Sequence, residues 1–277
     1  MITLNDKTIG IGSFPDGTIL MKPERDLSRR ARITWRYEND REFLALIYLV
    51  KHLRRSGYEI FNLYMPYIPN ARMDRVKNDE DVFTLKYFAE ILNDLKLDSV
   101  EVLDPHSSVS EALINNLIVE SPEFYIKQVL NKLPIRYREF ENPMTCERKR
   151  DFSPTMFYPD EGSVKRYAGM VDMPYAFGIK RRNWETGKIE GLDVAGAVDQ
   201  IKGKDVLIVD DICSRGGTFL HSAKKLKELG ANNIYLYVSH CENTILEGEL
   251  LTSGLIKKVY TTDSIFTKSH ELIEVLK

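Results

Sequence analysis

One stretch of the sequence, residues 206–218, restricts the fold more than any other. It reads Val-Leu-Ile-Val-Asp-Asp-Ile-Cys-Ser-Arg-Gly-Gly-Thr: an apolar run, two acids, a turn with two glycines and the start of an amphipathic helix. Glycine adopts the left-handed backbone that tight turns need, and a helix N-terminus offers N–H groups to an anion. Because ligands of open α/β sheets bind beyond the carboxyl ends of strands, this order predicts a phosphate site at a strand–turn–helix junction.

The rest of the chain alternates short apolar runs with amphipathic stretches, which is typical of α/β proteins with mainly parallel sheets. We expect helices at residues 41–56, 82–95 and 218–229, and strands at residues 60–65, 99–103, 155–158, 175–179, 206–209 and 234–238. Residues 120–152, where we expect a helix together with a charged, Pro-bearing stretch, separate two halves. The sequence therefore predicts two similar doubly wound domains, residues 1–130 and 131–277, with the boundary placed to within about ten residues.

Composition and charge exclude several classes of protein. The 277 residues carry a formal net charge of −2, so no net basic field attracts nucleic acid or an anionic membrane. The longest purely apolar run, residues 43–50, is far shorter than the roughly 20 residues that span a bilayer. Residues 1–7 lack the basic and apolar segments of a secretory signal. We expect a cytoplasmic protein with neither a nucleic-acid nor a membrane partner.

The three cysteines form neither a CxxC pair nor a disulfide framework. We expect Cys146, Cys213 and Cys241 to be reduced thiols, mostly buried. Although Cys213 lies in the predicted phosphate loop, no histidine adjoins it in sequence, and nothing indicates a nucleophile or a redox switch.

Residues 210–218 resemble the binding signature for phosphoribosyl pyrophosphate (PRPP) that type I phosphoribosyltransferases and PRPP synthetases share. Other segments resemble PRPP synthetases, the ribose-phosphate pyrophosphokinases, in the same order along the chain. These segments are Ser13-Phe-Pro-Asp-Gly-Thr18, residues 65–75 with Pro-Tyr-Ile-Pro-Asn-Ala-Arg-Met-Asp-Arg, Asp104-Pro-His-Ser107, residues 158–166 with Pro-Asp-Glu-Gly-Ser-Val-Lys-Arg, Ile179-Lys-Arg-Arg182 and Val238-Ser-His240.

This resemblance implies two type I phosphoribosyltransferase-like domains and an enzyme that needs Mg²⁺. Such an enzyme moves the β,γ-pyrophosphate of ATP to the 1-hydroxyl of ribose 5-phosphate, giving PRPP and AMP for nucleotide biosynthesis. The segment around Phe14 and Asp16 binds ATP across a subunit interface in the family, which implies a homo-oligomer, a dimer or larger.

The resemblance also assigns roles to individual residues. Lys180 and Arg182 would neutralise charge in the transition state. His106 would serve both catalysis and Mg-ATP binding, and Asp160 would be a direct or water-mediated Mg²⁺ ligand near the second substrate. The residues implied for ATP are Phe14, Asp16, Arg72, Asp74 and His106, and those implied for the ribose phosphate are Asp210, Asp211, Ser214, Arg215, Gly216, Gly217 and Thr218.

Each of these residues has a plainer alternative. Lys-Arg-Arg is common in solvated basic turns, and an isolated histidine is usually structural. An aspartate after Pro159 can simply form a turn, Arg72 can be an ordinary surface residue, and Phe14 can pack against the core. The acids at 210 and 211 can be merely solvated.

The chain departs from the family pattern at several positions. Ser163 stands where the pyrophosphate loop has its second glycine, which makes that turn stiffer. Arg215 adds a guanidinium to the phosphate loop, and the loop loses an acid. The replacements are Ser13 for Arg, Thr18 for Glu, Met73 for Gln, Ser163 for Gly, and Ser214-Arg215 for Asp-Thr.

Three other functions remain open from the sequence. The same chemistry on ADP-ribose would give ADP-ribose pyrophosphate and belong to NAD metabolism, because Arg215 favours either acceptor by charge. A type I phosphoribosyltransferase would share only residues 210–218. An inactive regulatory paralogue would have no physical need for the cations at 180 and 182.

Overall fold

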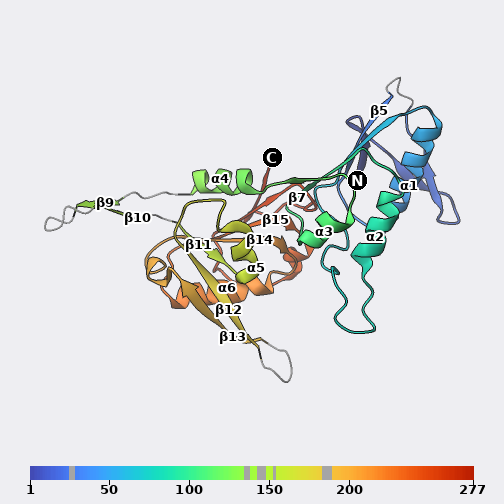
Figure 1. Cartoon of the computed structure of the whole chain (residues 1–277). Coiled ribbons are helices and arrows are strands. Elements are labelled where there is room, and N and C mark those ends of the chain that lie inside the picture. The colour runs from blue at the N-terminus through green and yellow to red at the C-terminus, as the bar shows by residue number, and fades with distance from the viewer. Residues whose placement is uncertain (25–28, 134–137, 142–147, 152–153, 183–188) are drawn as a thin grey trace. The chain divides into compact units, whose positions relative to one another are not determined.

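A computed structural model describes residues 1–24, 29–133, 138–141, 148–151, 154–182 and 189–277. These residues form two compact units, Met1–Ser121 and Pro122–Lys277 (Figure 1). The boundary expected at residues 130 and 131 falls inside helix α4 (Glu123–Lys132). The buried side of α4, with Ile126 and Val129, packs into the core of the second unit.

The first unit is built on a six-stranded sheet in the order β2-β1-β5-β6-β7-β8. Strands β5 to β8 are parallel, whereas β1 and β2 are antiparallel additions at one edge. The bounds of the strands are β1 Ile2–Leu4, β2 Lys7–Thr8, β5 Arg30–Trp35, β6 Ile60–Tyr64, β7 Ser99–Leu103 and β8 Leu117–Glu120. A separate antiparallel pair, β3 (Ile11–Ser13) and β4 (Ile19–Met21), forms a short hairpin.

Helices α1 (Asp40–Arg55), α2 (Thr84–Asn93) and α3 (Ser108–Leu113) complete this unit. Both α1 and α2 repeat apolar residues at helical spacing, so each buries one face. Phe43 of α1 stacks on Trp35 at 5.6 Å between ring centroids and lies 4.6 Å from Phe88 of α2. This aromatic cluster joins the two helices to the sheet.

The second unit contains a seven-stranded sheet in the order β13-β12-β11-β14-β15-β16-β17. All neighbouring strands are parallel except the β12–β13 pair. The bounds of the strands are β11 Thr155–Tyr158, β12 Tyr175–Arg182, β13 Ile189–Gly196, β14 Val206–Cys213, β15 Ile234–Cys241, β16 Lys258–Thr262 and β17 Ile273–Leu276. A further antiparallel pair, β9 (Arg138–Glu141) and β10 (Arg148–Asp151), lies outside this sheet.

The central strands of this sheet are covered on both faces. In β14, Val206 and Ile208 belong to one apolar cluster, and Leu207 and Val209 belong to another. A strand that is buried on both faces needs a continuous apolar run rather than an alternating one. The covering helices include α4, α5 (Glu161–Tyr167) and α6 (Gly217–Glu228), so the unit is doubly wound.

The structure confirms the expected α/β architecture of two domains with mainly parallel sheets. The described part of the chain contains no helix that is long and apolar enough to cross a membrane. Cys213 and Cys241 are buried free thiols, in register on β14 and β15. A hydrogen bond with Cys241, together with burial, raises the pKa of Cys213 and suppresses its reactive thiolate. Cys146 lies outside the described residues.

Candidate active site

Asp160 connects strand β11 to helix α5 in the second unit. It is the N-cap of α5, and its Oδ1 accepts a hydrogen bond from the N–H of Ser163 at 3.1 Å. An N-cap carboxylate accepts a hydrogen bond from a helix N–H group, and its negative charge interacts favourably with the positive end of the helix dipole. The residue predicted to bind a metal therefore also has a local structural role.

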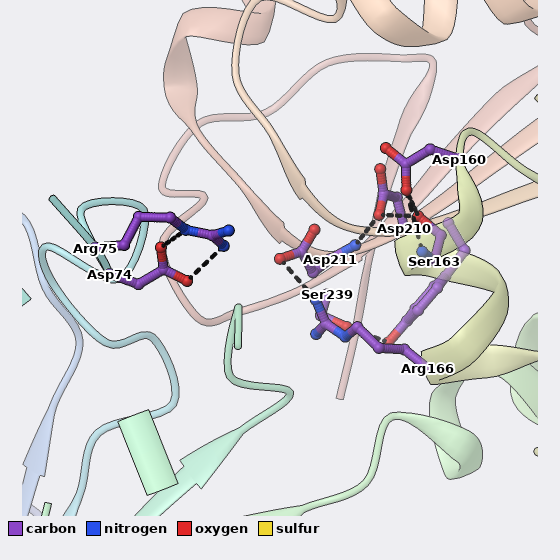
Figure 2. Close-up of polar contacts among 9 residues, drawn as sticks. Asp74, Arg75, Asp160, Ser163, Arg166, Asp210, Asp211 and Ser239 are labelled. Atoms are coloured by element: carbon purple, nitrogen blue, oxygen red, sulfur yellow. Dashed lines mark hydrogen bonds and ion pairs between the residues drawn. The ribbon is translucent and has the colours of Figure 1, made fainter. Parts of the chain in front are cut away.

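Asp210 and Asp211 lie near the carboxyl end of the neighbouring strand β14, where the sequence predicted a ligand site. The hydroxyl oxygen of Ser163 is 2.9 Å from Asp210 Oδ1 and 3.3 Å from Asp160 Oδ1. Arg166, on the same helix as Ser163, forms an ion pair of 3.0 Å with Asp211. Figure 2 shows these side chains converging from α5 and the end of β14. The structure thus brings Asp160, Asp210 and Asp211 together.

The electrostatics of this group of carboxyls are unusual. Burial and the negative charge of Asp211 raise the pKa of Asp210 to about 7. The charge of Asp160 acts in the same direction, whereas hydrogen bonds from Ser163 and from the N–H of Asp211 oppose it. Ionised Asp210 is therefore unfavourable here unless a hydrogen-bond donor or a cation approaches. Hydroxyl groups of a sugar are donors of this kind.

The glycine turn that the sequence predicted as a phosphate loop joins β14 to α6. Gly216 has φ +78° and is the N-cap of α6, so the 12-residue helix points its N-terminal N–H groups at the loop. A Cβ on Gly216 would lie 2.8 Å from Leu250 Cδ2, and one on Gly248 would lie 1.9 Å from the carbonyl oxygen of Arg215. The segment after β15, with Gly248 and Leu250, therefore packs closely against the loop between β14 and α6 and restricts its conformation. The exposed Arg215 side chain pairs with Glu247 at 3.0 Å.

Three predicted ATP-binding residues, Arg72, Asp74 and His106, lie in the first unit. Asp74 is buried and receives hydrogen bonds from the exposed Arg75 at 2.8 and 3.2 Å (Figure 2). The Arg75 hydrogen bond lowers the pKa of Asp74, and Ser107 and the charge of His106 contribute. Asp74 and His106 are thus brought close together, while Arg72 is exposed.

The segment with Phe14 and Asp16 forms the turn of the β3–β4 hairpin. Asp16 Oδ1 accepts hydrogen bonds from the Thr18 N–H at 3.0 Å and hydroxyl at 2.7 Å, and these hydrogen bonds lower its pKa. The Phe14 side chain is 49% exposed, which argues against the alternative that it packs into the core. Thr18 stabilises the turn at the position where the family has glutamate.

The remaining predicted residues are Lys180 and Arg182. Their backbone belongs to strand β12, which pairs with β13. Their side chains lie outside the described part of the structure. The antiparallel partner of this strand, residues 189–196, was not predicted from the sequence.

Two contacts were not predicted from the sequence, namely Ser163 with Asp210 and Arg166 with Asp211. Both α5 residues lie in the segment that resembles the pyrophosphate loop, but no role was assigned to either side chain. Asp160 is a good N-cap residue, and an N-cap side chain accepts a hydrogen bond from the N–H two or three residues into the helix, so this signal could have placed Ser163 beside Asp160.

The oxygen donors near Asp160 can be compared with those that Mg²⁺ prefers. Within the described ranges, no group of three or more His, Cys, Asp or Glu side chains is arranged to hold a metal ion. Mg²⁺ in phosphate-transfer sites is usually held by one or two carboxylates together with waters and substrate phosphates. The oxygen-rich surroundings of Asp160 fit that kind of site.

The sheet of the second unit and its loop between β14 and α6 have a type I phosphoribosyltransferase-like fold. Residues 164–265 match the family described as the phosphoribosyl transferase domain.

More particularly, the chain resembles ribose-phosphate pyrophosphokinases over most of its length. It is 27% identical to the enzyme from Thermococcus kodakarensis over 237 residues, which are 84% of this chain and 77% of that one. It is also 27% identical to the enzyme from Shewanella oneidensis over 279 residues, covering 96% of this chain and 81% of the relative. The resemblance inferred from the motifs is confirmed, and it is a resemblance to a class of enzymes.

A solved structure shows the same fold. Phosphoribosylpyrophosphate synthetase from Mycobacterium smegmatis matches 97% of this chain and 85% of its own, with a TM-score of 0.75 and 16% sequence identity. The α/β fold of the two domains is thus shared with that protein.

Proposed function

We propose that this protein is a Mg²⁺-dependent diphosphotransferase that moves the β,γ-pyrophosphate of ATP to the 1-hydroxyl of ribose 5-phosphate. The products are PRPP and AMP. The observation that carries this proposal is the pair of aspartates, Asp210 and Asp211, held beside a phosphate loop by two residues of α5. Similarity to ribose-phosphate pyrophosphokinases over both units supports this reading.

In this proposal the acceptor binds at the carboxyl end of β14. Asp210 and Asp211 accept hydrogen bonds from ribose hydroxyls, and residues 214–218 hold the 5-phosphate. The α6 N-terminus supplies backbone N–H groups and a favourable dipole to a phosphate dianion. The exposed guanidinium of Arg215 adds a charge-assisted hydrogen bond when it exchanges its partner Glu247 for phosphate.

ATP binds to residues of the first unit in this proposal. Asp74 and His106 lie near its phosphates, and Arg72 supplies a fork that suits paired phosphate oxygens. Phe14 is exposed enough to stack on the adenine, with Asp16 beside it. Because this hairpin serves a neighbouring subunit in the family that the motifs resemble, we propose a homo-oligomer of at least two chains.

Chemistry in this proposal depends on positioning and charge rather than on a covalent intermediate. Lys180 and Arg182 neutralise the charge that develops between attacking and leaving oxygens. His106 would help to hold Mg-ATP, and Asp160 would hold Mg²⁺ near the ribose phosphate; the metal would offset the negative charge of the transferred group.

A second acceptor, ADP-ribose, deserves a direct test because of the Arg215 side chain. Arg215 is exposed where the resembling family has threonine, so it can meet a diphosphate as well as a single phosphate. A phosphoribosyltransferase acting without ATP is less favoured, since the similarity to the pyrophosphokinases extends through the first unit.

One assay separates these functions. Purified protein is incubated with Mg-ATP and with ribose 5-phosphate, with ADP-ribose, or with no acceptor, and released AMP is measured. The proposal predicts AMP release that depends on ribose 5-phosphate. Release with ADP-ribose alone would keep the reaction type and change the acceptor, and no release with either would refute a diphosphotransferase.

A further inference from the structure

Ser163 stands where the pyrophosphate loop of the resembling family has glycine. Ser163 is 4% exposed and lies in the first turn of α5. Its backbone N–H is bound to Asp160, and its hydroxyl reaches two carboxylates on two different elements.

The chemistry of a hydroxyl decides which of these two contacts is the stronger. A serine hydroxyl carries one proton, so it donates one hydrogen bond at a time. The distance is 2.9 Å to Asp210 Oδ1 and 3.3 Å to Asp160 Oδ1. O–H···O bonds are strongest near 2.7–2.8 Å. The hydroxyl of Ser163 therefore donates to Asp210, and Asp160 fixes the position of Ser163 through its backbone N–H.

The hydrogen bond from Ser163 distinguishes the two carboxylate oxygens of Asp210. Within the described residues, the two hydrogen bonds that Asp210 accepts, from Ser163 and from the N–H of Asp211, reach the same atom, Oδ1. Oδ2 is then the oxygen that a ligand hydroxyl can approach. Without the serine hydroxyl, repulsion by Asp160 and Asp211 would favour rotation of the Asp210 carboxylate.

From these contacts we propose that Ser163 is a positioning residue that orients Asp210 toward the ribose hydroxyls of the acceptor. Ser163 touches neither the transferred group nor the acceptor; it acts through Asp210. This role of Ser163 depends on the proposed function in one respect, which is that the ligand is a ribose phosphate. A chain with glycine at this position would orient the same carboxylate by other means.

The test compares Ser163→Ala with Ser163→Thr and with Thr155→Val. Alanine removes the hydroxyl and keeps the Cβ, whereas threonine keeps the hydroxyl. Thr155 is a matched control because it is also buried, on the strand that leads to Asp160, and its hydroxyl binds the carbonyl oxygen of Gln200. Both Ser163→Ala and Thr155→Val lose one buried hydroxyl, but only the first loss affects Asp210.

Binding of ribose 5-phosphate and of PRPP, each with Mg²⁺, is measured by calorimetry, and steady-state kinetics follow where AMP is released. We expect Ser163→Ala to weaken binding and to raise the acceptor KM about tenfold, equivalent to about 1.4 kcal/mol. Its kcat and its KM for ATP should stay within about twofold of wild type. Ser163→Thr should recover most of the affinity, and Thr155→Val should lower only the melting temperature.

The outcomes distinguish this inference from the proposed function. A wild type that binds ribose phosphates but releases no AMP would refute the diphosphotransferase and leave the Ser163 comparison fully readable. Equal affinities of Ser163→Ala and wild type would overturn the positioning role. The positioning role would also be overturned if the wild type bound neither ribose 5-phosphate nor PRPP. It would be overturned as well if Ser163→Ala and Thr155→Val showed the same loss of kcat and the same changes in both KM values.

Discussion

Arg166 on α5 and Asp211 at the end of β14 form an ion pair with 3.0 Å between Nη1 and Oδ2. The Asp211 side chain is 8% exposed and that of Arg166 is 26% exposed. The guanidinium also lies over the ring of Tyr167, 5.1 Å from its centroid. This pair ties the segment that resembles a pyrophosphate loop to the strand that resembles a PRPP-binding strand.

Removing the cation of this pair should be costly. Arg166→Ala removes the cation that pairs with a buried carboxylate, and we expect the free energy of unfolding to fall by about 2–3 kcal/mol in urea titrations. The control is Lys225→Ala, which breaks the more exposed pair with Glu228 in the same unit. It should cost no more than about 0.5 kcal/mol. Equal losses in the two variants would show that the Arg166 pair has no special role.

The raised pKa of Asp210 predicts a stability that depends on pH. The pKa is about 7 in the folded protein against an ordinary value of 3.8, so the folded state holds the proton more tightly than the unfolded chain. Stability from this group is complete below about pH 4 and is lost as the pH rises through about 7.

Asp210→Asn should remove this dependence. At pH 8 we expect the variant to be more stable than wild type by about 1–3 kcal/mol, with the range reduced for partial exposure. At pH 4 the two should agree closely. The measurement is urea unfolding of both proteins at several pH values, and a difference that does not change with pH would contradict the assignment.

Gly248 should be essential to the shape of the phosphate loop. A Cβ at this position would lie 1.9 Å from the carbonyl oxygen of Arg215, so Gly248→Ala must displace backbone. We expect a loss of about 1–3 kcal/mol in stability and weaker binding of ribose 5-phosphate in calorimetry. Gly169→Ala, where no atom lies within 4 Å of the added Cβ, is the control and should be nearly neutral. Unchanged phosphate binding in Gly248→Ala would mean that the loop does not hold the ligand.

Lys180 and Arg182 are proposed to act on the transition state. Alanine at either position should lower kcat by roughly 10²–10³-fold and change the KM for ATP little. Steady-state kinetics with Mg-ATP provide the measurement. A rise in KM with unchanged kcat would instead indicate that the two residues only bind substrate.

The parts of the fold that local sequence specifies were predicted well. The apolar run that became β14 could be recognised because a strand buried on both faces needs such a run. The carboxyl-end acids and the glycine turn followed from the same stretch. Strand β13 was missed because its residues, with Gly191 and Gly196 among them, lack a strong strand pattern.

The contacts that complete the candidate site could not be read from the sequence. Ser163 and Asp210 are 47 residues apart, and their meeting depends on how α5 packs beside β14. The same holds for Arg166 with Asp211, and for Gly248 against the phosphate loop. A motif identifies residue types at a short spacing, whereas tertiary packing decides which oxygen each carboxylate presents.

The central claim is that both terminal phosphates of ATP move as one group to a ribose 1-hydroxyl. The most direct test follows the products of Mg-ATP and ribose 5-phosphate by phosphorus NMR and mass spectrometry. We predict AMP and PRPP in equal amounts, with the β- and γ-phosphorus atoms of ATP both found at C1 of the ribose. Formation of ADP and a ribose bisphosphate, or of AMP and free pyrophosphate with the ribose 5-phosphate unchanged, would contradict this account.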